Sequence, residues 1–178
     1  MAIVVVGGGG RGAGKTALIC GLIRALPVSS WTAVKVTTHA HGRGEPVFEE
    51  TVAGERNDTG RYLAAGARRA LLVTAHEGEL EAILRKICED RPQPAHTIFE
   101  SNSVLRYVRP DLCLAVASNL TGGHKPSFEM VERCADATVA LGGHDHVIDG
   151  ERIHFHLKSL ERISATMAAW LREKLPEL

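Results

Sequence analysis

Short runs of apolar residues alternate along the chain with stretches in which apolar residues recur at helical spacing. This pattern predicts strands interleaved with helices. The apolar runs are rich in β-branched residues, as in strands that are buried on both faces of a parallel sheet. They predict strands at 3–6, 31–38, 68–75, 95–101, 111–118 and 135–141, and a short edge strand at 151–157.

The amphipathic stretches between these runs predict helices, and prolines mark several of the helix ends. The first helix ends at Pro27, the third stops before Pro92, and the fourth carries a proline in its first turn. The predicted helices span 15–26, 54–67 (after an N-terminal turn), 78–90, 125–135 and 159–175. The alternation indicates an α/β fold of three layers, with a mainly parallel sheet and helices on both faces. Because 178 residues contain no repeat and no linker-like segment, we expect a single domain over 1–178.

A glycine-rich segment, GGGGRGAGKT at 7–16, connects the first strand to the first helix. From Gly9 onward it fits the phosphate-binding pattern G-x-x-x-x-G-K-[ST], in the strand-to-helix context that this motif requires. Glycines let backbone N–H groups converge on phosphate oxygens, and the N-terminal dipole of the helix favours the same negative charge. We expect a nucleoside triphosphate to bind to Gly9, Gly10, Arg11, Gly12, Ala13, Gly14, Lys15 and Thr16.

The overall composition narrows the choice of partners. Lysine plus arginine equals aspartate plus glutamate at 21 each, which argues against a general binder of nucleic acid or of membrane surfaces. Aromatic residues make up only 4% of the chain, too few for a base-stacking platform. The four cysteines lack paired spacing, and the first apolar run is too short for a leader or a membrane helix. We therefore expect a cytoplasmic protein that binds neither nucleic acid nor membrane.

Polar residues follow several of the predicted strands. In open α/β sheets, ligands bind beyond the carboxyl ends of the strands, so these residues are expected to share one rim with the glycine-rich segment. The polar stretch 41–58 is long and interrupted by glycines, as in a mobile substrate loop. The rim candidates are Thr37, Thr38, His39, His41 and Gly42 after the second strand, Glu100, Ser101, Asn102 and Ser103 after the fourth, and 118–125 after the fifth.

Two acids of the rim are candidates for metal chemistry. Lys15 is expected to reach the β- and γ-phosphates, and the Thr16 hydroxyl to bind Mg²⁺. Glu100 ends an apolar strand, where it could hold the Mg²⁺ or orient an attacking water; the alternative is an exposed strand-end acid. Asp58 precedes a helical stretch, so that Mg²⁺ binding and capping of that helix are both open for it.

Histidines occur in three alternating pairs. Alternate residues of a strand share a face, so each pair could chelate a transition metal, although pairs of this kind also arise by chance. The position of the first pair on the rim favours contact with substrate or phosphate instead. The pairs are His39/His41, His144/His146 and His154/His156.

Three blocks of the chain resemble the MobB-like P-loop proteins, the nucleotide-binding partners in molybdopterin guanine dinucleotide biosynthesis. These are GGGGRGAGKTALICGLIRAL, VKVTTHAHG and NDTGRYLAAGARRALLVT, which together lie within about the first 75 residues. The resemblance implies that Lys15 and Thr16 bind phosphate and Mg²⁺, and that Asp58 and Arg61 lie near the active rim. The chain departs from the family after Glu100, where it has SNS instead of glycine, which leaves a different client or substrate open.

The resemblance also frames a more specific hypothesis about the rim. Thr38, His39, Asp58 and Arg61 are expected to converge on the phosphate end of the nucleotide. Arg61 would then supply positive charge toward the γ-phosphate or an anionic substrate, and His39 a hydrogen bond or a proton. In the competing structural interpretation, Arg61 pairs with a surface acid and Asp58 only caps its helix.

The sequence does not determine which nucleobase is bound or which reaction is catalysed. Asn119 stands where guanine-specific proteins begin an Asn-Lys-x-Asp motif, but Leu120 replaces the lysine, so both GTP and ATP remain candidates. Three functions fit: a slow nucleoside triphosphatase assisting molybdenum cofactor biosynthesis and its client proteins, a metallochaperone triphosphatase using the histidine pairs, and a small-molecule kinase. A non-catalytic nucleotide sensor also fits, and both a monomer and a homodimer are compatible with the sequence.

Overall fold

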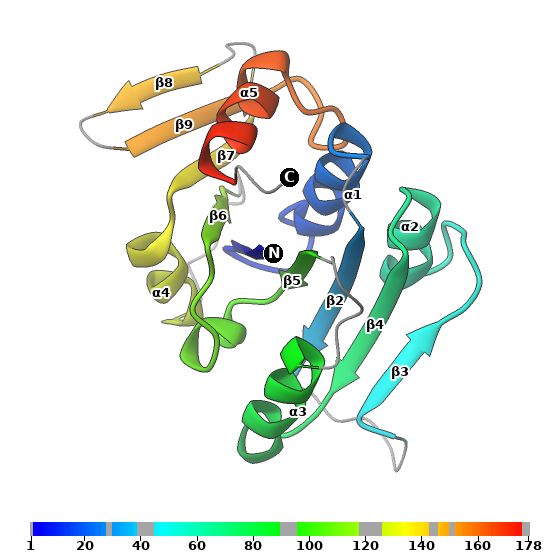
Figure 1. Cartoon of the computed structure of the whole chain (residues 1–178). Coiled ribbons are helices and arrows are strands. Elements are labelled where there is room, and N and C mark those ends of the chain that lie inside the picture. Colours follow the sequence, from blue (N-terminus) through cyan, green and yellow to red (C-terminus); the bar gives the residue numbers. More distant parts are fainter. Residues whose placement is uncertain are drawn as a thin grey trace.

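The computed structural model describes residues 2–27, 30–38, 45–89, 96–117, 126–142, 146–149 and 152–175. These residues form a nine-stranded sheet with the order β3-β4-β2-β5-β1-β6-β7-β9-β8 (Figure 1). The strands are β1 (Ile3–Gly8), β2 (Trp31–Thr37), β3 (Val47–Glu50), β4 (Arg69–Thr74), β5 (His96–Glu100), β6 (Leu112–Val116), β7 (Ala137–Leu141), β8 (His146–Asp149) and β9 (Arg152–Leu157). The helices are α1 (Lys15–Ala25), α2 (Asp58–Ala64), α3 (Glu77–Glu89), the 3₁₀ helix η1 (Ser103–Arg106), α4 (Pro126–Cys134) and α5 (Ala165–Lys174).

Strand β1 lies in the interior of the sheet. It pairs in parallel with β5 on one side and with β6 on the other. Parallel pairing continues outward from β5 to β2 and β4, and from β6 to β7 and β9. Only the two edges are antiparallel, β3 against β4 and β8 against β9. The carboxyl ends of the interior strands consequently open onto one rim.

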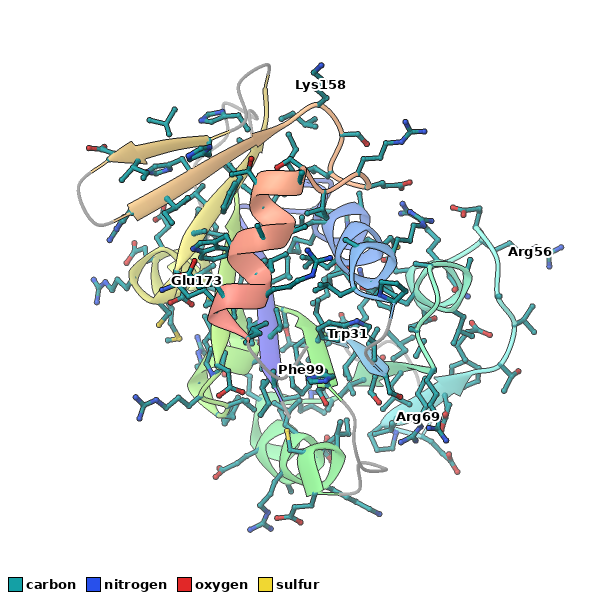
Figure 2. The ribbon with its side chains drawn as sticks, turned by 45° about the horizontal axis from the view of Figure 1, so that its top comes forward. Trp31, Arg56, Arg69, Phe99, Lys158 and Glu173 are labelled. Carbon is teal, nitrogen blue, oxygen red and sulfur yellow. The ribbon has the colours of Figure 1, made fainter. Side chains whose placement is uncertain are left out.

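Helices cover both faces of this sheet, because consecutive residues of each interior strand point to opposite sides. Val4 and Val6 of β1 pack into a core with α1, α2 and α5, whereas Val5 packs into a second core with α3. A third, smaller cluster joins β6 to α4. Trp31 belongs to the first core and Phe99 to the second, and both lie inside the molecule (Figure 2). The predicted class, a mainly parallel three-layer α/β sheet, is confirmed.

Helix α1 is held in place by a segment far along the chain. Gly21 packs so closely on the connection between β9 and α5 that a Cβ there would lie 2.6 Å from the Leu160 carbonyl oxygen. The same connection carries Glu161, which bonds Arg24 of α1 at 3.4 Å. The second half of α1 is therefore held against this later segment of the chain.

The main differences from the sequence-based expectation lie at the sheet edges. Strand β3 falls inside 41–58, which was expected to be a loop, and β8 was not expected at all, so that β9 is the penultimate strand and not the edge. All four residues of β8 are exposed, and those of β3 are exposed or partly buried. Each of these strands has only two apolar residues, which are adjacent, so it shows neither a long apolar run nor an alternation of apolar and polar residues. Helix α5 begins at Ala165, later than the predicted 159, whereas α2 begins at Asp58, after the turn that was expected at the start of 54–67.

Candidate functional site

A cavity of about 920 Å³ opens at the carboxyl ends of β1, β2 and β5. Its wall contains the glycine-rich segment together with the polar ends of β2 and β5 and the first turn of α2. This confirms that the rim of the sheet brings these segments together. The lining residues are Gly8, Gly10, Arg11, Gly12, Ala13, Gly14, Lys15, Thr16, Ala17, Lys35, Val36, Thr37, Thr38, Asp58, Arg61, Glu77, Glu100, Ser101, Asn102, Ser103, Arg106 and Ser127.

The glycine-rich segment forms one wall of the cavity through its backbone. Gly12 and Gly14 have φ angles of 78° and 93°, in the left-handed region that favours glycine. Gly14 is the N-cap of α1, and it supplies no side-chain acceptor for the first N–H groups of the helix. The first turn of α1 itself carries no acidic residue, so no acid of the helix offsets its N-terminal dipole. This wall is suited to an anion.

The two left-handed glycines differ in their surroundings. A Cβ at Gly14 would lie 2.2 Å from Cδ1 of Leu160, whereas a Cβ at Gly12 would meet no atom within 4 Å. Gly14 is therefore required by both conformation and space, and Gly12 by conformation alone. This distinction cannot be read from the motif, in which both positions are simply glycine.

Asn102 anchors the beginning of the segment. Its Oδ1 accepts from the Gly8 N–H at 2.9 Å, and its Nδ2 donates to the Gly8 carbonyl at 3.0 Å and to Ser127 Oγ at 3.3 Å. One amide side chain thus ties the end of β1 to the turn after β5 and to α4. The sequence placed Asn102 on the rim, but it did not indicate this supporting role.

The side chain of Lys15, the first residue of α1, extends back to the glycine-rich segment. Its Nζ donates to the Gly10 carbonyl at 2.8 Å, so the ammonium group already points into the part of the loop where phosphate is expected. A phosphate oxygen would compete with this carbonyl for the same donor.

Opposite the loop, Glu100 is the centre of a side-chain network. Its side chain is 5% exposed and accepts from Thr16 Oγ1 at 2.7 Å, from Lys35 Nζ at 2.8 Å, and from the Tyr62 hydroxyl. The alternative of an exposed strand-end acid is therefore wrong. The contact with Thr16 places the carboxylate beside the hydroxyl that was expected to bind Mg²⁺. Its role in metal binding and catalysis stays a prediction.

Lys35 was not predicted as a site residue. It lies opposite Glu100 in the β2–β5 register, and its Nζ donates to Asp58 Oδ2 as well as to Glu100. Burial alone would lower the pKa of Lys35, but attraction by Glu100 and the hydrogen bonds to both carboxylates raise it above its ordinary value. The only sequence signal was a lysine inside an otherwise apolar strand, WTAVKVT.

Asp58 faces this network and does not cap its helix. The N-cap of α2 is Asn57, whose side chain accepts from the Gly60 N–H at 2.6 Å, so the capping alternative for Asp58 is corrected. Burial favours a raised pKa for Asp58, yet hydrogen bonds from Lys35 and Thr16 and the charge of Lys35 keep that pKa below its usual value. Asp58 is therefore held as a carboxylate next to Thr16.

Arg61 combines features of both interpretations that the sequence left open. It lines the cavity with Lys15, but its guanidinium also pairs with Glu161 at 2.7 Å and with Glu55 at 3.3 Å. Thr38 lines the same cavity. His39 and Asn119 lie outside the described residues, so their predicted contacts with phosphate and base stay predictions.

In the described part of the chain, histidine and cysteine side chains are not grouped as a transition-metal site would require. No group of three or more His, Cys, Asp or Glu residues there is placed to hold a metal ion by itself. His39, His41 and His144 lie outside the described residues, which leaves His154 and His156 on β9 as a complete pair. No helix in the described ranges is long and apolar enough to cross a membrane.

The fold and the loop together define a P-loop α/β protein. No family model and no curated protein matches the chain. Among solved structures, the chain is similar to LpxK from Aquifex aeolicus in complex with ATP, with 18% sequence identity and a TM-score of 0.47. The match covers 79% of this chain and 48% of LpxK, so the chain spans about half the length of that protein.

Proposed function

We propose that this protein binds a Mg²⁺–nucleoside triphosphate in the cavity of about 920 Å³ and hydrolyses it slowly. One observation carries the proposal: the glycine-rich loop and Glu100 share this cavity, and Glu100 is bonded to the Thr16 hydroxyl at the loop's end. A phosphate held by the loop would therefore lie next to hard oxygen donors.

The donor set fits Mg²⁺ rather than a transition metal. Thr16, Asp58 and Glu100 offer one hydroxyl and two carboxylates, and Mg²⁺ favours sites with one or two carboxylates completed by phosphate oxygens and water. When bound, Mg²⁺ would neutralise charge that develops on the phosphates. Within this set, Glu100 orients the Thr16 hydroxyl, and the low pKa of Asp58 keeps it ionised.

The surrounding residues would divide the work of hydrolysis. Lys15 would exchange the Gly10 carbonyl for oxygens of the β- and γ-phosphates. Arg61 would direct positive charge toward the γ-phosphate from the cavity wall. A water oxygen would bond to the γ-phosphorus while the bond from the γ-phosphorus to the β–γ bridging oxygen breaks. The proton lost by the water would pass to the phosphate that forms, and the products would be nucleoside diphosphate and inorganic phosphate.

Two finer assignments belong to this proposal. ATP and GTP are both retained as the nucleotide. A role as accessory protein in molybdenum cofactor biosynthesis rests on the three sequence blocks that resemble MobB-like proteins. We also propose a cytoplasmic location, which is supported by four cysteines that are present as thiols and not as disulfides: Cys20, Cys88, Cys113 and Cys134.

Phosphoryl transfer to a metabolite is a second candidate because the cavity continues past the phosphate region. Besides the residues already discussed, its lining includes Ser101, Ser103, Arg106 and Glu77, which offer hydroxyls and both signs of charge. A polar acceptor could be seated there beside the expected γ-phosphate. Transfer of phosphate from ATP or GTP to such an acceptor, in excess of release to water, would favour a kinase.

Calorimetry with Mg²⁺–ATP and Mg²⁺–GTP, using wild-type protein and Lys15→Ala, tests the binding site. We expect the substitution to weaken triphosphate binding by about 2 kcal/mol, because a charge-assisted contact is lost. Lys158→Ala is the matched control, since Lys158 points outward from the surface (Figure 2). Equal affinities in wild type and Lys15→Ala would contradict the proposed site.

A further inference from the structure

The Lys35 ammonium group occupies the space between two carboxylates of the cavity. Its Nζ donates to Glu100 Oε1 at 2.8 Å and also to Asp58 Oδ2. Thr16 lies next to both acids, because its hydroxyl donates to Glu100 at 2.7 Å and also contributes to the lowered pKa of Asp58. The Lys35 ammonium group thus donates hydrogen bonds to carboxylate oxygens that would otherwise be ligands of a divalent cation beside Thr16.

The backbone of Lys35 cannot move away from this place. Lys35 is in the interior of the sheet on β2, which pairs with β4 on one side and β5 on the other. Its side chain is nevertheless 27% exposed and lines the cavity together with Lys15 and Gly12. A long flexible side chain on a fixed backbone can therefore redirect its ammonium group within the cavity without any change in the fold.

Charge balance determines which cation the carboxylates accept. Glu100 and Asp58 provide two negative charges, and the Lys35 ammonium already offsets one of them. A divalent cation at the same oxygens would be close to this ammonium, and like charges at such a distance repel strongly. Both cations can be accommodated only when another anion joins the cavity.

We propose that Lys35 is a positioning residue that closes the divalent-cation position beside Thr16, Asp58 and Glu100 until a triphosphate arrives. The terminal phosphate then provides a new anionic partner for the ammonium, which releases carboxylate oxygens to the metal. The inference rests on the proposed function. It adds that metal binding depends on nucleotide, and it names the residue responsible.

Binding of Mn²⁺ without nucleotide tests this role directly, with loss of the free-ion EPR signal as the readout. Wild-type protein should bind Mn²⁺ much more weakly alone than with a non-hydrolysable ATP or GTP analogue, after subtraction of the Mn²⁺ that the same analogue binds without protein. Lys35→Met should bind Mn²⁺ alone at least about tenfold more tightly than wild type, because the repelling ammonium is gone. Lys158→Met, which removes an exposed charge, should behave as wild type (Figure 2).

A merely structural ion pair would give a different result. Lys35→Met would then lower the thermal unfolding midpoint without gaining affinity for Mn²⁺, which would overturn the proposal. The double variant Lys35→Met/Glu100→Gln should lose the gain, since a carboxylate ligand is missing; persistence of the gain would place the Mn²⁺ elsewhere and also overturn it.

The wild-type measurement keeps the test decisive even if Lys35→Met fails to fold. Equal Mn²⁺ affinity with and without nucleotide analogue in wild type would contradict a closed metal position. Failure of the proposed function has a separate signature, in which wild-type protein binds neither analogue. In that case, the gain of Mn²⁺ affinity in Lys35→Met would still support the exclusion of metal by Lys35.

Discussion

The two walls of the cavity are built in different ways. The loop wall presents backbone, with Gly12 and Gly14 in left-handed conformations and no side-chain cap on α1. The opposite wall presents side chains, with Glu100 accepting from Thr16, Lys35 and Tyr62. The loop wall depends on stereochemistry, and the opposite wall depends on the balance of charges and hydrogen bonds. Substitutions that are harmless on one wall should therefore be damaging on the other.

The largest expected effect is on the side-chain wall. Glu100→Gln preserves size but removes the charge beside the Thr16 hydroxyl, and we expect turnover to fall about 100-fold, as for the loss of a group that supports a metal. Triphosphate affinity should change by no more than about threefold, because the loop wall is untouched. Steady-state hydrolysis at saturating Mg²⁺, together with calorimetry, checks both values. A loss of affinity equal to the loss of turnover would show that the two walls are not separable.

The second-largest expected effect is a loss in the free energy of unfolding caused by a substitution in the loop wall. Gly14→Ala adds a Cβ at a φ of 93°, where it would lie 2.2 Å from Leu160, and we expect a loss of about 2–3 kcal/mol. Gly12→Ala is the matched control, since its φ is 78° but its Cβ would meet open space. It should cost only about 1 kcal/mol, from backbone strain alone. Urea unfolding measures both; equal losses would mean that Leu160 moves aside freely.

The smallest effect comes from an uncharged donor of the side-chain wall. Tyr62→Phe removes one of the three donors to Glu100, and we expect a loss of about 1 kcal/mol in the free energy of unfolding at neutral pH. Thr16 and Lys35 still satisfy the carboxylate, which limits the loss.

The same tyrosine makes stability depend on alkaline pH. Burial, followed by the neighbouring Glu100, raises the pKa of Tyr62 well above its ordinary value of 10.0. Above that pH the unfolded chain loses a proton that the folded chain keeps, so stability should fall as pH rises. Burial also raises the pKa of Cys20 from 9.0 to about 11, which adds to the fall. Unfolding between pH 9 and 11 should show a shallower decline for Tyr62→Phe; identical slopes would contradict this origin.

The difference between the two walls also explains which parts of the fold and the site could be predicted from the sequence. A backbone wall needs a local run of glycines, so residues 7–16 predicted the loop, its flanking strand and its helix. Glu100 was found because it ends an apolar strand. The interior strands were found for the same reason, since burial on both faces leaves an unbroken apolar run.

The side-chain wall is assembled from distant segments, which no local pattern records. Lys35 and Tyr62 reach Glu100 across separations of 65 and 38 residues, respectively. Each lies in an element whose pattern is explained by packing, so neither stood out. Asn102 is a similar case, because its link to Gly8 exists only once β1 and β5 are adjacent.

The position of β1 between β5 and β6 has a consequence for synthesis on the ribosome. The loop emerges early, but Gly8 meets Asn102 and Thr16 meets Glu100 only after a further 94 and 84 residues have been made. Contacts of such sequence separation form late, because the intervening chain must be closed into a loop first. A nascent chain that ends before β5 would therefore carry the complete phosphate-binding motif without a cavity to place it in. The nucleotide proposed for this site could therefore assist maturation only after most of the chain has left the ribosome.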